Sequence, residues 1–255
     1  MDIKLSYQSV IGGKETNQDS LLIERADTPM GDVIFAAVCD GMGGLSKGEL
    51  ASADMVRTCD RWFSDSFPKL LESGFSAQKL YAEWNSLIQL ENKKLVQYGA
   101  AGEIALGTTI AALLLMDGHY YIVNVGDSRV YAVSNHDISV LTRDQTLVMN
   151  EAERGMMSYE EMEKDSRGKY LLECIGVNDT VNPDFFEGKL ETPIMFFLCS
   201  DGCRHLITNE EFFQMLNPQS IESEEKLSEN IQRIVQENIN RGETDNISAI
   251  AFKVE

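Results

Sequence analysis

Several aspartates stand where an apolar run of the sequence ends and a small or polar residue follows. The clearest run, 33–39, ends at Asp40 and is followed by Gly41. A second run, 196–199, leads into Ser200 and Asp201. An apolar run that stops at a glycine turn predicts a buried strand with one carboxylate at its end. Such a carboxylate either accepts hydrogen bonds from the turn or binds a cation, and for one run alone the structural role is favoured.

The same placement recurs along the whole chain, which favours one shared site. The candidates, each at the edge of an apolar run beside a small or polar residue, are Asp19, Asp40, Asp127, Asp201 and Asp245. Carboxylates a few ångströms apart cannot all ionise unless cations neutralise them. Oxygen ligands without histidine or cysteine favour Mg²⁺ or Mn²⁺ over Zn²⁺. Two such ions roughly 3.5–4 Å apart, bridged by a carboxylate and a hydroxide, suit in-line attack on phosphorus. The pattern therefore predicts hydrolysis of a phosphate ester.

Composition narrows the class of protein. The chain carries 41 acidic and 22 basic residues, a net charge of −19, which argues against binding to nucleic acid or to anionic membrane. The longest apolar run, near 110–116, is too short to span a bilayer, and the first residues lack the features of a signal peptide. The 5 cysteines lack paired Cys-x-x-Cys spacing. We therefore expect a reduced, cytoplasmic protein.

The spacing of apolar residues predicts the elements that position these aspartates. Helical spacing is expected over 47–63, with Leu50 facing the core, and from an N-cap at Ser76 to Gly99, with Tyr98 on the buried stripe. A later helix carries Leu227, Ile231, Ile234, Val235 and Ile239 on one face. Strands are expected at 3–10, 19–24, 33–39, 109–116, 120–125, 129–134, 138–142, 193–199 and 247–254.

Turn signals indicate how these strands connect. Tight turns at 117–118 and 135–136 predict that the four middle strands form hairpins of an antiparallel sheet. The pattern as a whole indicates two packed antiparallel sheets covered by helices, an α+β fold. No linker rich in Pro, Gly or Ser divides the chain, so we expect a single domain over 1–255.

Residues 144–180 differ from the rest because they have many charges and little strand pattern. Capping boxes are expected at Ser158, inside this stretch, and at Thr208, beyond it. The stretch is either a mobile flap over a site or a plain helical insert on the surface. The sequence leaves both interpretations open.

The ordered set of motifs resembles a known family. The motifs are Asn17-Gln18-Asp19, Asp40-Gly41-Met42-Gly43-Gly44, Gly107-Thr108-Thr109, Val125-Gly126-Asp127-Ser128-Arg129, Ser200-Asp201-Gly202 and Asp245-Asn246-Ile247-Ser248. In this order they resemble the metal-dependent protein serine/threonine phosphatases, the PPM or type 2C family, and they span nearly the whole chain. The Gly-Met-Gly-Gly after Asp40 is similar to the bacterial branch.

The resemblance implies a four-layer α-β-β-α sandwich of two antiparallel sheets flanked by helix pairs, with Mn²⁺ or Mg²⁺ in a cleft at one edge. It implies that Asp40 bridges two metals, that the Gly41 carbonyl, Asp201 and Asp245 complete their ligands, and that Asp19 holds metal-bound waters. Asp127 matches a residue that, with Asp201, binds a third metal in bacterial relatives. The bridging hydroxide would attack phosphoserine or phosphothreonine directly, and 144–180 matches the family's flap.

Four residues depart from the family's pattern. Lys14 stands where an arginine usually grips the substrate phosphate, so it keeps the charge and loses the bidentate fork. Gln18 replaces a commoner glutamate, and Met42 replaces a histidine of many eukaryotic members. His205 stands where relatives have aspartate or asparagine. It is either a capping or surface residue, the favoured interpretation, or a ligand or proton donor near the third metal.

Two hypotheses follow. The first is an active cytoplasmic phosphatase that opposes a serine/threonine kinase and works as a monomer, with Asp40, Asp201, Asp245 and Lys14 as catalytic residues. The second is a catalytically weak sensor or binding module on the same fold, which the departures at positions 14, 18 and 205 motivate.

Overall fold

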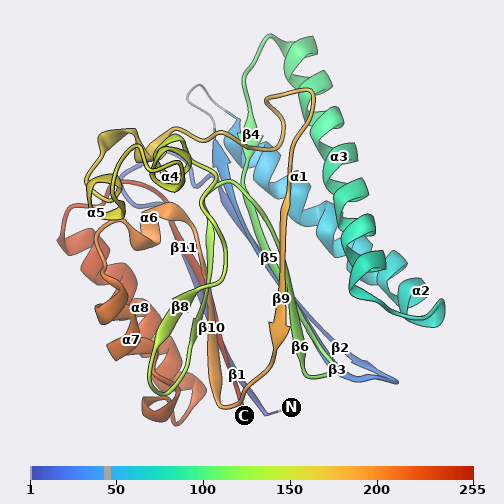
Figure 1. The fold of residues 1–255 in the computed structure, drawn as a ribbon, viewed down its shortest axis with the longest axis vertical. Coiled ribbons are helices and arrows are strands. Elements are labelled where there is room, and N and C mark those ends of the chain that lie inside the picture. Colours follow the sequence, from blue (N-terminus) through green and yellow to red (C-terminus); the bar gives the residue numbers. More distant parts are fainter. Residues whose placement is uncertain (1, 43–46) are drawn as a thin grey trace.

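The computed structural model describes residues 2–42 and 47–255 (Figure 1). One sheet has the strand order β1-β11-β10-β7-β8, and the other has the order β2-β3-β5-β6-β9, with β4 paired to β3. All of these pairings are antiparallel. The strands are β1 (Ile3–Val10), β2 (Asp19–Thr28), β3 (Gly31–Met42), β4 (Gly107–Thr108), β5 (Ile110–Met116), β6 (His119–Val125), β7 (Arg129–Val133), β8 (Ile138–Val140), β9 (Asp184–Lys189), β10 (Ile194–Cys199) and β11 (Ile247–Val254).

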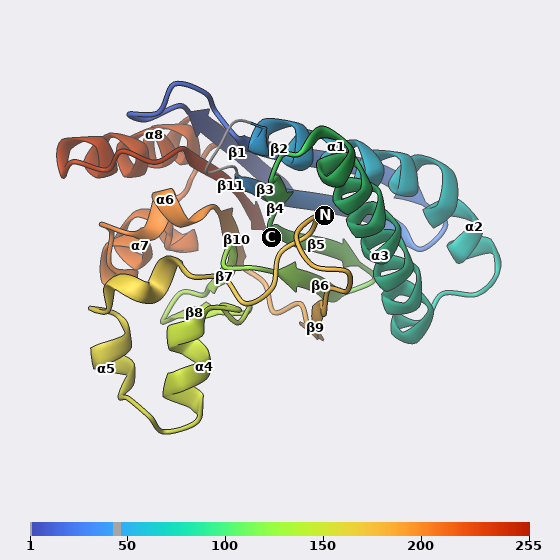
Figure 2. The same cartoon turned by 90° about the horizontal axis from the view of Figure 1, so that it is seen from above.

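Helices cover the outer faces of both sheets. Figures 1 and 2 show α1, α2 and α3 along the sheet that contains β3, and α7 and α8 along the sheet that contains β10. This arrangement of layers confirms the predicted fold of two antiparallel sheets flanked by helices. The helices are α1 (Gly48–Arg61), α2 (Phe67–Glu72), α3 (Ala77–Gly102), α4 (Leu147–Glu153), α5 (Tyr159–Met162), α6 (Asp201–Arg204), α7 (Asn209–Leu216) and α8 (Glu224–Asn240), with a π-helix at Trp62–Ser66 and 3₁₀ turns at Ser166–Lys169 and Pro218–Ser220.

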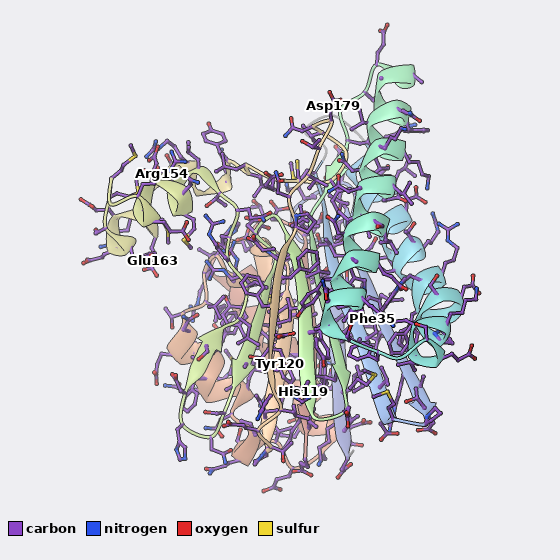
Figure 3. The ribbon with its side chains drawn as sticks, turned by 45° about the vertical axis from the view of Figure 1, so that its right-hand side comes forward. Phe35, His119, Tyr120, Arg154, Glu163 and Asp179 are labelled. Atoms are coloured by element: carbon purple, nitrogen blue, oxygen red, sulfur yellow. The ribbon has the colours of Figure 1, made fainter. Side chains whose placement is uncertain are left out.

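Strand β3 is buried on both faces, which explains why its sequence is an unbroken apolar run. Ile34, Ala36 and Val38 belong to the cluster between the sheets. Phe35 and its alternate neighbours belong instead to the cluster beneath the helices, where the Phe35 ring lies 5.2 Å from that of Trp62 (Figure 3). A strand covered on both sides gains apolar contacts at every position, so it shows no polar alternation.

Several predicted helix ends agree with the structure. Ser76 caps α3 by accepting a hydrogen bond from the Lys79 amide. The two capping boxes, at Ser158 and Thr208, are both formed. Helix α3 continues three residues past the predicted end, and Glu103 after it adopts φ 52.

Two expectations from the sequence were wrong. The four middle strands do not form one sheet, because β5 and β6 lie in one sheet while β7 and β8 lie in the other. Leu50, Tyr98 and Ile239 do not face the core and are 39%, 47% and 42% exposed. Strand β9 and helix α2 were not predicted. The β9 sequence mixes two aromatics with charges, as an edge strand half-covered by its neighbours does.

The strand ends that carry the candidate aspartates gather at one end of the sandwich. Both chain termini lie at the opposite end, while α4 and α6 lie at the candidate end (Figure 1). The stretch that includes Arg154 and Glu163 projects from the sandwich at this end (Figure 3). Residues 144–180 therefore border the edge where the aspartates meet.

Within the described ranges, none of the helices is both long enough and apolar enough to cross a membrane.

Candidate active site

Asp40 is fixed by its strand neighbours. The β2–β3 register sets Asp19 directly opposite Asp40. The Asp40 amide donates to the Thr109 hydroxyl at 2.9 Å, and the Thr109 amide donates back to the Asp40 carbonyl at 2.9 Å. The Thr109 hydroxyl also meets the Ser128 hydroxyl at 2.7 Å. The Gly-Thr-Thr motif thus holds the backbone of Asp40 and links it to the residue after Asp127.

Gly41 allows three backbone segments to meet behind Asp40. Its amide donates to the Gln18 carbonyl at 3.0 Å. A Cβ built at Gly41 would overlap the carbonyl oxygens of Gln18 and Gly48. Its role as a metal ligand through the carbonyl stays a prediction. The next glycines of the motif, Gly43 and Gly44, lie outside the described residues.

We expect Gly41→Ala to destabilise the protein by about 3 kcal/mol or more, because both overlapping partners are backbone atoms that cannot rotate away. The midpoint of urea unfolding, measured without metal, checks this. Gly102→Ala is the matched control, since its Cβ would meet only the Ile104 side chain at 3.4 Å and beyond. A loss no larger than the control's would contradict the predicted overlap.

Asp201 reaches the site from the other sheet. It is the first residue of α6, and only Ser200 separates it from the end of β10. The Ser200 amide donates to the Ser248 carbonyl at 3.0 Å, and the Ser200 hydroxyl donates to Asp19 Oδ2 at 2.8 Å. Ser200 therefore ties the Asp19 carboxylate of one sheet to the strand ends of the other.

Asp245 is placed by the loop that precedes β11. Asn246 Oδ1 accepts from the Gln18 amide at 2.8 Å, and its Nδ2 donates to the carbonyls of Ile11 and Thr16 at 2.9 and 3.1 Å. This amide side chain holds the loop of residues 11–18 against Asp245. In consequence the Lys14 ammonium lies 2.9 Å from Asp245 Oδ1.

Asp127 and Asp144 belong to a buried network with two arginines. Arg204 Nη2 lies 3.3 Å from Oδ2 of Asp127 and 3.3 Å from Oδ2 of Asp144. Arg129 donates to both oxygens of Asp144, at 2.8 and 2.7 Å. The two carboxylates are 8% exposed. Each therefore has a guanidinium partner, as burial of a carboxylate demands.

Burial and mutual repulsion disfavour the charged forms of three of these aspartates in the absence of metal. Desolvation, with the negative charges of Asp201 and Asp245 added to it, raises the pKa of Asp19 to about 7. Desolvation and the Asp201 charge likewise raise the pKa of Asp127 to about 7, against the effect of Arg204. Desolvation and the Asp201 charge also raise the pKa of Asp40 well above its ordinary value. The centre is therefore short of positive charge.

Asp201 differs from these three aspartates because a basic side chain favours its charged form. Desolvation opposes its ionisation, but the hydrogen bond and charge of His205 outweigh it and lower the pKa of Asp201. His205 Nε2 lies 3.3 Å from Asp201 Oδ2, and its Nδ1 lies 3.1 Å from Glu243 Oε2. The bond to Asp201 raises the pKa of His205 to about 9. His205 is 40% exposed, yet it contacts the site and is more than a helix cap.

The carboxylate oxygens at this site are ligands of the type that hard divalent cations prefer. The site is also short of positive charge, which such cations would supply. Asp19 Oδ1 is buried and has no hydrogen-bond partner among the described residues. As the side chains stand, however, no three His, Cys, Asp or Glu groups within the described ranges form a ready coordination shell. Lys14 and His205 occupy oxygens of Asp245 and Asp201 instead. One oxygen of each of these carboxylates is therefore paired with a basic side chain in this structure.

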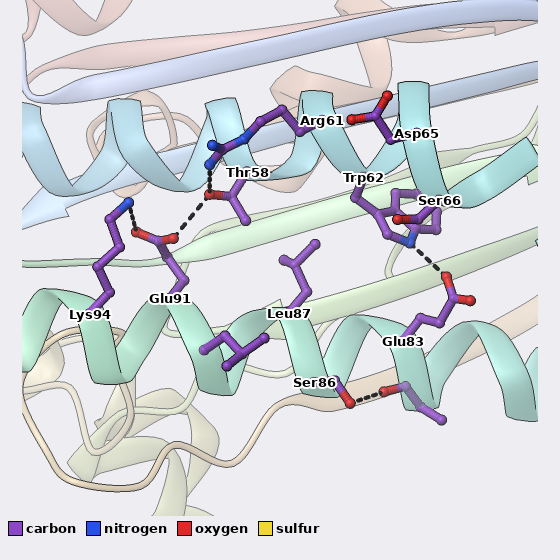
Figure 4. Close-up of a pocket in the computed structure, with 12 residues that line it drawn as sticks. Thr58, Arg61, Trp62, Asp65, Ser66, Glu83, Ser86, Leu87, Glu91 and Lys94 are labelled. Atoms are coloured by element: carbon purple, nitrogen blue, oxygen red, sulfur yellow. Dashed lines mark hydrogen bonds and ion pairs between the residues drawn. The ribbon is translucent and has the colours of Figure 1, made fainter. Parts of the chain in front are cut away.

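Two cavities differ in their relation to these residues. One, of about 720 Å³, lies between the 144–180 stretch and α6–α7 and is lined by Asp127, Arg204 and His205 among others. The other, of about 810 Å³, lies between α1 and α3 (Figure 4). The second contains none of the predicted site residues, and several of its polar side chains bond to one another, as in the bond from Thr58 to Glu91 at 3.0 Å. The first cavity borders the candidate site.

The structure brings all five candidate aspartates and Lys14 to one edge, although their roles as ligands stay predictions. The sequence did not indicate the supporting residues. Ser200 and Asn246 stood inside the quoted motifs, so their position beside an aspartate was the available signal. Arg204 and Asp144 carried no such signal, because nothing in their local pattern shows that they meet Asp127.

The chain is similar to known proteins over most of its length. A profile of the family described as protein phosphatase 2C matches residues 8–236. The serine/threonine phosphatase stp of Listeria monocytogenes is 32% identical over 217 residues, which are 84% of this chain and 81% of that protein. Protein phosphatase PhpP of Streptococcus pneumoniae is 27% identical over 251 residues, 96% of this chain and 95% of that protein.

Solved structures show the same fold. The serine/threonine phosphatase of S. agalactiae superposes with a TM-score of 0.86 at 25% identity, over 100% of both chains. The catalytic domain of the phosphatase PstP, solved with 2 manganese ions, gives a TM-score of 0.78 at 21% identity over 98% of this chain and 97% of that one. Since the family profile covers most of the sequence and the Listeria relative is 32% identical over 84% of it, the chain belongs to the protein phosphatase 2C family, as the order of its motifs predicted.

Proposed function

We propose that this protein phosphatase hydrolyses phosphoserine and phosphothreonine in proteins with the help of two divalent cations. The observation that carries the proposal is the gathering of carboxylates from both sheets at one edge, where their raised pKa values mark a shortage of positive charge. The names of the Listeria and Streptococcus relatives support the substrate class.

Asp40, Asp201 and Asp245 would hold the two cations, with the Gly41 carbonyl as a further ligand and Asp19 beside them. Carboxylate and carbonyl oxygens suit Mn²⁺ or Mg²⁺, and the manganese in the PstP structure supports the former. When bound, the cations would supply an activated water and neutralise charge on the phosphoryl oxygens. The protein's own contribution is to fix the carboxylates through Thr109, Ser200 and Asn246.

We further propose that the chain acts as one domain over 1–255, monomeric and cytoplasmic, in signalling that reverses a serine/threonine kinase. Residues 144–180 would act as the flap that borders the site, because they form one wall of the 720 Å³ cavity beside Asp127.

The direct test is release of phosphate from a phosphothreonine peptide by the purified protein with Mn²⁺, with and without a chelator. We expect turnover that the chelator abolishes. Normal binding of Mn²⁺ without any release of phosphate would contradict the proposal. It would favour the second candidate, a catalytically weak sensor or binding module, for which the pairing of Asp245 and Asp201 with Lys14 and His205 is the motivating observation.

Lys14 is proposed to bind the substrate phosphate. Its ammonium sits among carboxylates, and although desolvation opposes protonation, the bond to Asp245 raises the pKa of Lys14, so it stays charged. Lys14→Ala should raise KM by about tenfold, because a charge-assisted hydrogen bond to phosphate is lost. Lys14→Arg is the control and should keep KM near that of the wild type. A fall in kcat with KM unchanged in Lys14→Ala would contradict a role in phosphate binding.

A further inference from the structure

Arg204 lies where the resemblance to bacterial relatives implies a third cation. Its Nη2 donates to the carbonyl oxygen of Asp127 at 3.0 Å and to Oδ2 of the same residue at 3.3 Å. The side chain is 13% exposed. One guanidinium group thus contacts the carbonyl oxygen and one carboxylate oxygen of Asp127, and little water reaches it.

The network behind Arg204 is balanced in charge. Asp144 accepts two hydrogen bonds from Arg129 and lies 3.3 Å from Arg204. Arg129 also donates to the Tyr131 hydroxyl at 3.1 Å. Two carboxylates, of Asp127 and Asp144, therefore alternate with two guanidinium groups. The number of guanidinium groups in this network thus equals the number of its carboxylates.

The second carboxylate implied for a third ion is that of Asp201, which is already assigned to the two-cation site proposed above. Asp201 Oδ2 faces His205 Nε2 at 3.3 Å, and His205 is held from behind by Glu243 at 3.1 Å. The remaining carboxylates, of Asp19, Asp40, Asp201 and Asp245, match the charge of two divalent cations. Four aspartates are therefore assigned to the two cations. Asp127 and Asp144 are assigned to the two arginines.

We propose that Arg204 takes the place of a third divalent cation, so that this chain binds two ions and Asp127 serves to hold Arg204. The inference rests on the two-cation site proposed above. An ion that bound Asp127 would have to displace Arg204 and leave its guanidinium buried with fewer acceptors, and Arg204 Nε already has no hydrogen-bond partner among the described residues. Separating a buried ion pair in this way is strongly unfavourable.

The test counts bound Mn²⁺ by equilibrium dialysis and elemental analysis, at one free Mn²⁺ concentration that saturates the wild type. We expect two ions in the wild type and two in Asp127→Asn. We expect three in Arg204→Met, which frees Asp127 while it keeps an unbranched side chain of similar length. Arg129→Met is the matched control: it removes a guanidinium from the same network without touching Asp127, and it should bind two ions.

Each outcome separates this inference from the proposed function. Three ions in the wild type, falling to two in Asp127→Asn, would overturn the replacement by Arg204 and leave the phosphatase proposal standing. A count of two in a folded Arg204→Met protein would also overturn it. A count of none or one in the wild type would overturn the two-cation site itself. If Arg204→Met does not fold, as judged by thermal melting, the comparison of wild type with Asp127→Asn decides.

Discussion

Asp40→Asn is expected to lower the rate of phosphate release from a phosphothreonine peptide by about 1,000-fold or more, a loss of about 4 kcal/mol in transition-state stabilisation. The proposed bridging ligand would lose the charge that holds two cations together. Binding of Mn²⁺ should weaken in parallel. Steady-state kinetics and calorimetric titration with Mn²⁺ measure the two effects.

The same substitution should leave the metal-free fold at least as stable as the wild type. Desolvation and the Asp201 charge raise the pKa of Asp40 well above its ordinary value, so the charged carboxylate is disfavoured in the metal-free fold and an uncharged amide removes that cost. Asp117→Asn is the control, because it makes the same chemical change in the β5–β6 turn, where φ of 51 suits asparagine. Full Mn²⁺ binding together with full turnover in Asp40→Asn would refute the bridging role.

Without metal, Asp19→Asn is expected to be more stable than the wild type, by an amount that grows as the pH rises from about 4 to about 7. Desolvation and neighbouring carboxylates raise the pKa of Asp19 from 3.8 to about 7 in the folded state. Between these values the folded protein binds more protons than the unfolded chain, so this group costs stability as pH increases. Each unit corresponds to about 1.4 kcal/mol, and the full effect is on the order of several kcal/mol.

The measurement is the difference in free energy of unfolding by urea between Asp19→Asn and the wild type, both in chelator, at several pH values. Groups that the two proteins share cancel in this difference. The substitution also removes the bond from the Ser200 hydroxyl to Oδ2. This loss changes the difference in free energy by the same amount at every pH, so the slope of the difference against pH is the informative quantity. Saturating Mn²⁺ should abolish the advantage of Asp19→Asn, because cations would neutralise the wild-type carboxylate. A flat difference in chelator would contradict the raised pKa.

The sequence predicted the elements whose identity depends on local pattern. The apolar run that ends at Asp40 became β3, and 247–254 became β11, because burial on both faces leaves an uninterrupted apolar signal. Capping boxes at Ser158 and Thr208 also formed as predicted, since they depend on residues three positions apart.

Pairing between sheets was not predictable in the same way. The strands 119–125 and 129–133 have similar patterns and a short connection, yet the chain crosses from one sheet to the other at Gly126. Turn chemistry is the same whether the next strand pairs with its predecessor or crosses over. Likewise Tyr98 fits a helical stripe but lies beyond the neighbours that would cover it, and is 47% exposed.

The sequence by itself determined which residues could do chemistry: five aspartates at strand edges, in the order of the protein phosphatase 2C family. Residue type and local periodicity are properties of short segments, so they can be read without coordinates. Only the tertiary structure decided which basic groups meet those aspartates. Lys14 meets Asp245, and Arg204 meets Asp127, across separations of 231 and 77 residues that no local pattern spans. Whether a carboxylate is free for a cation or already paired depends on these long-range contacts.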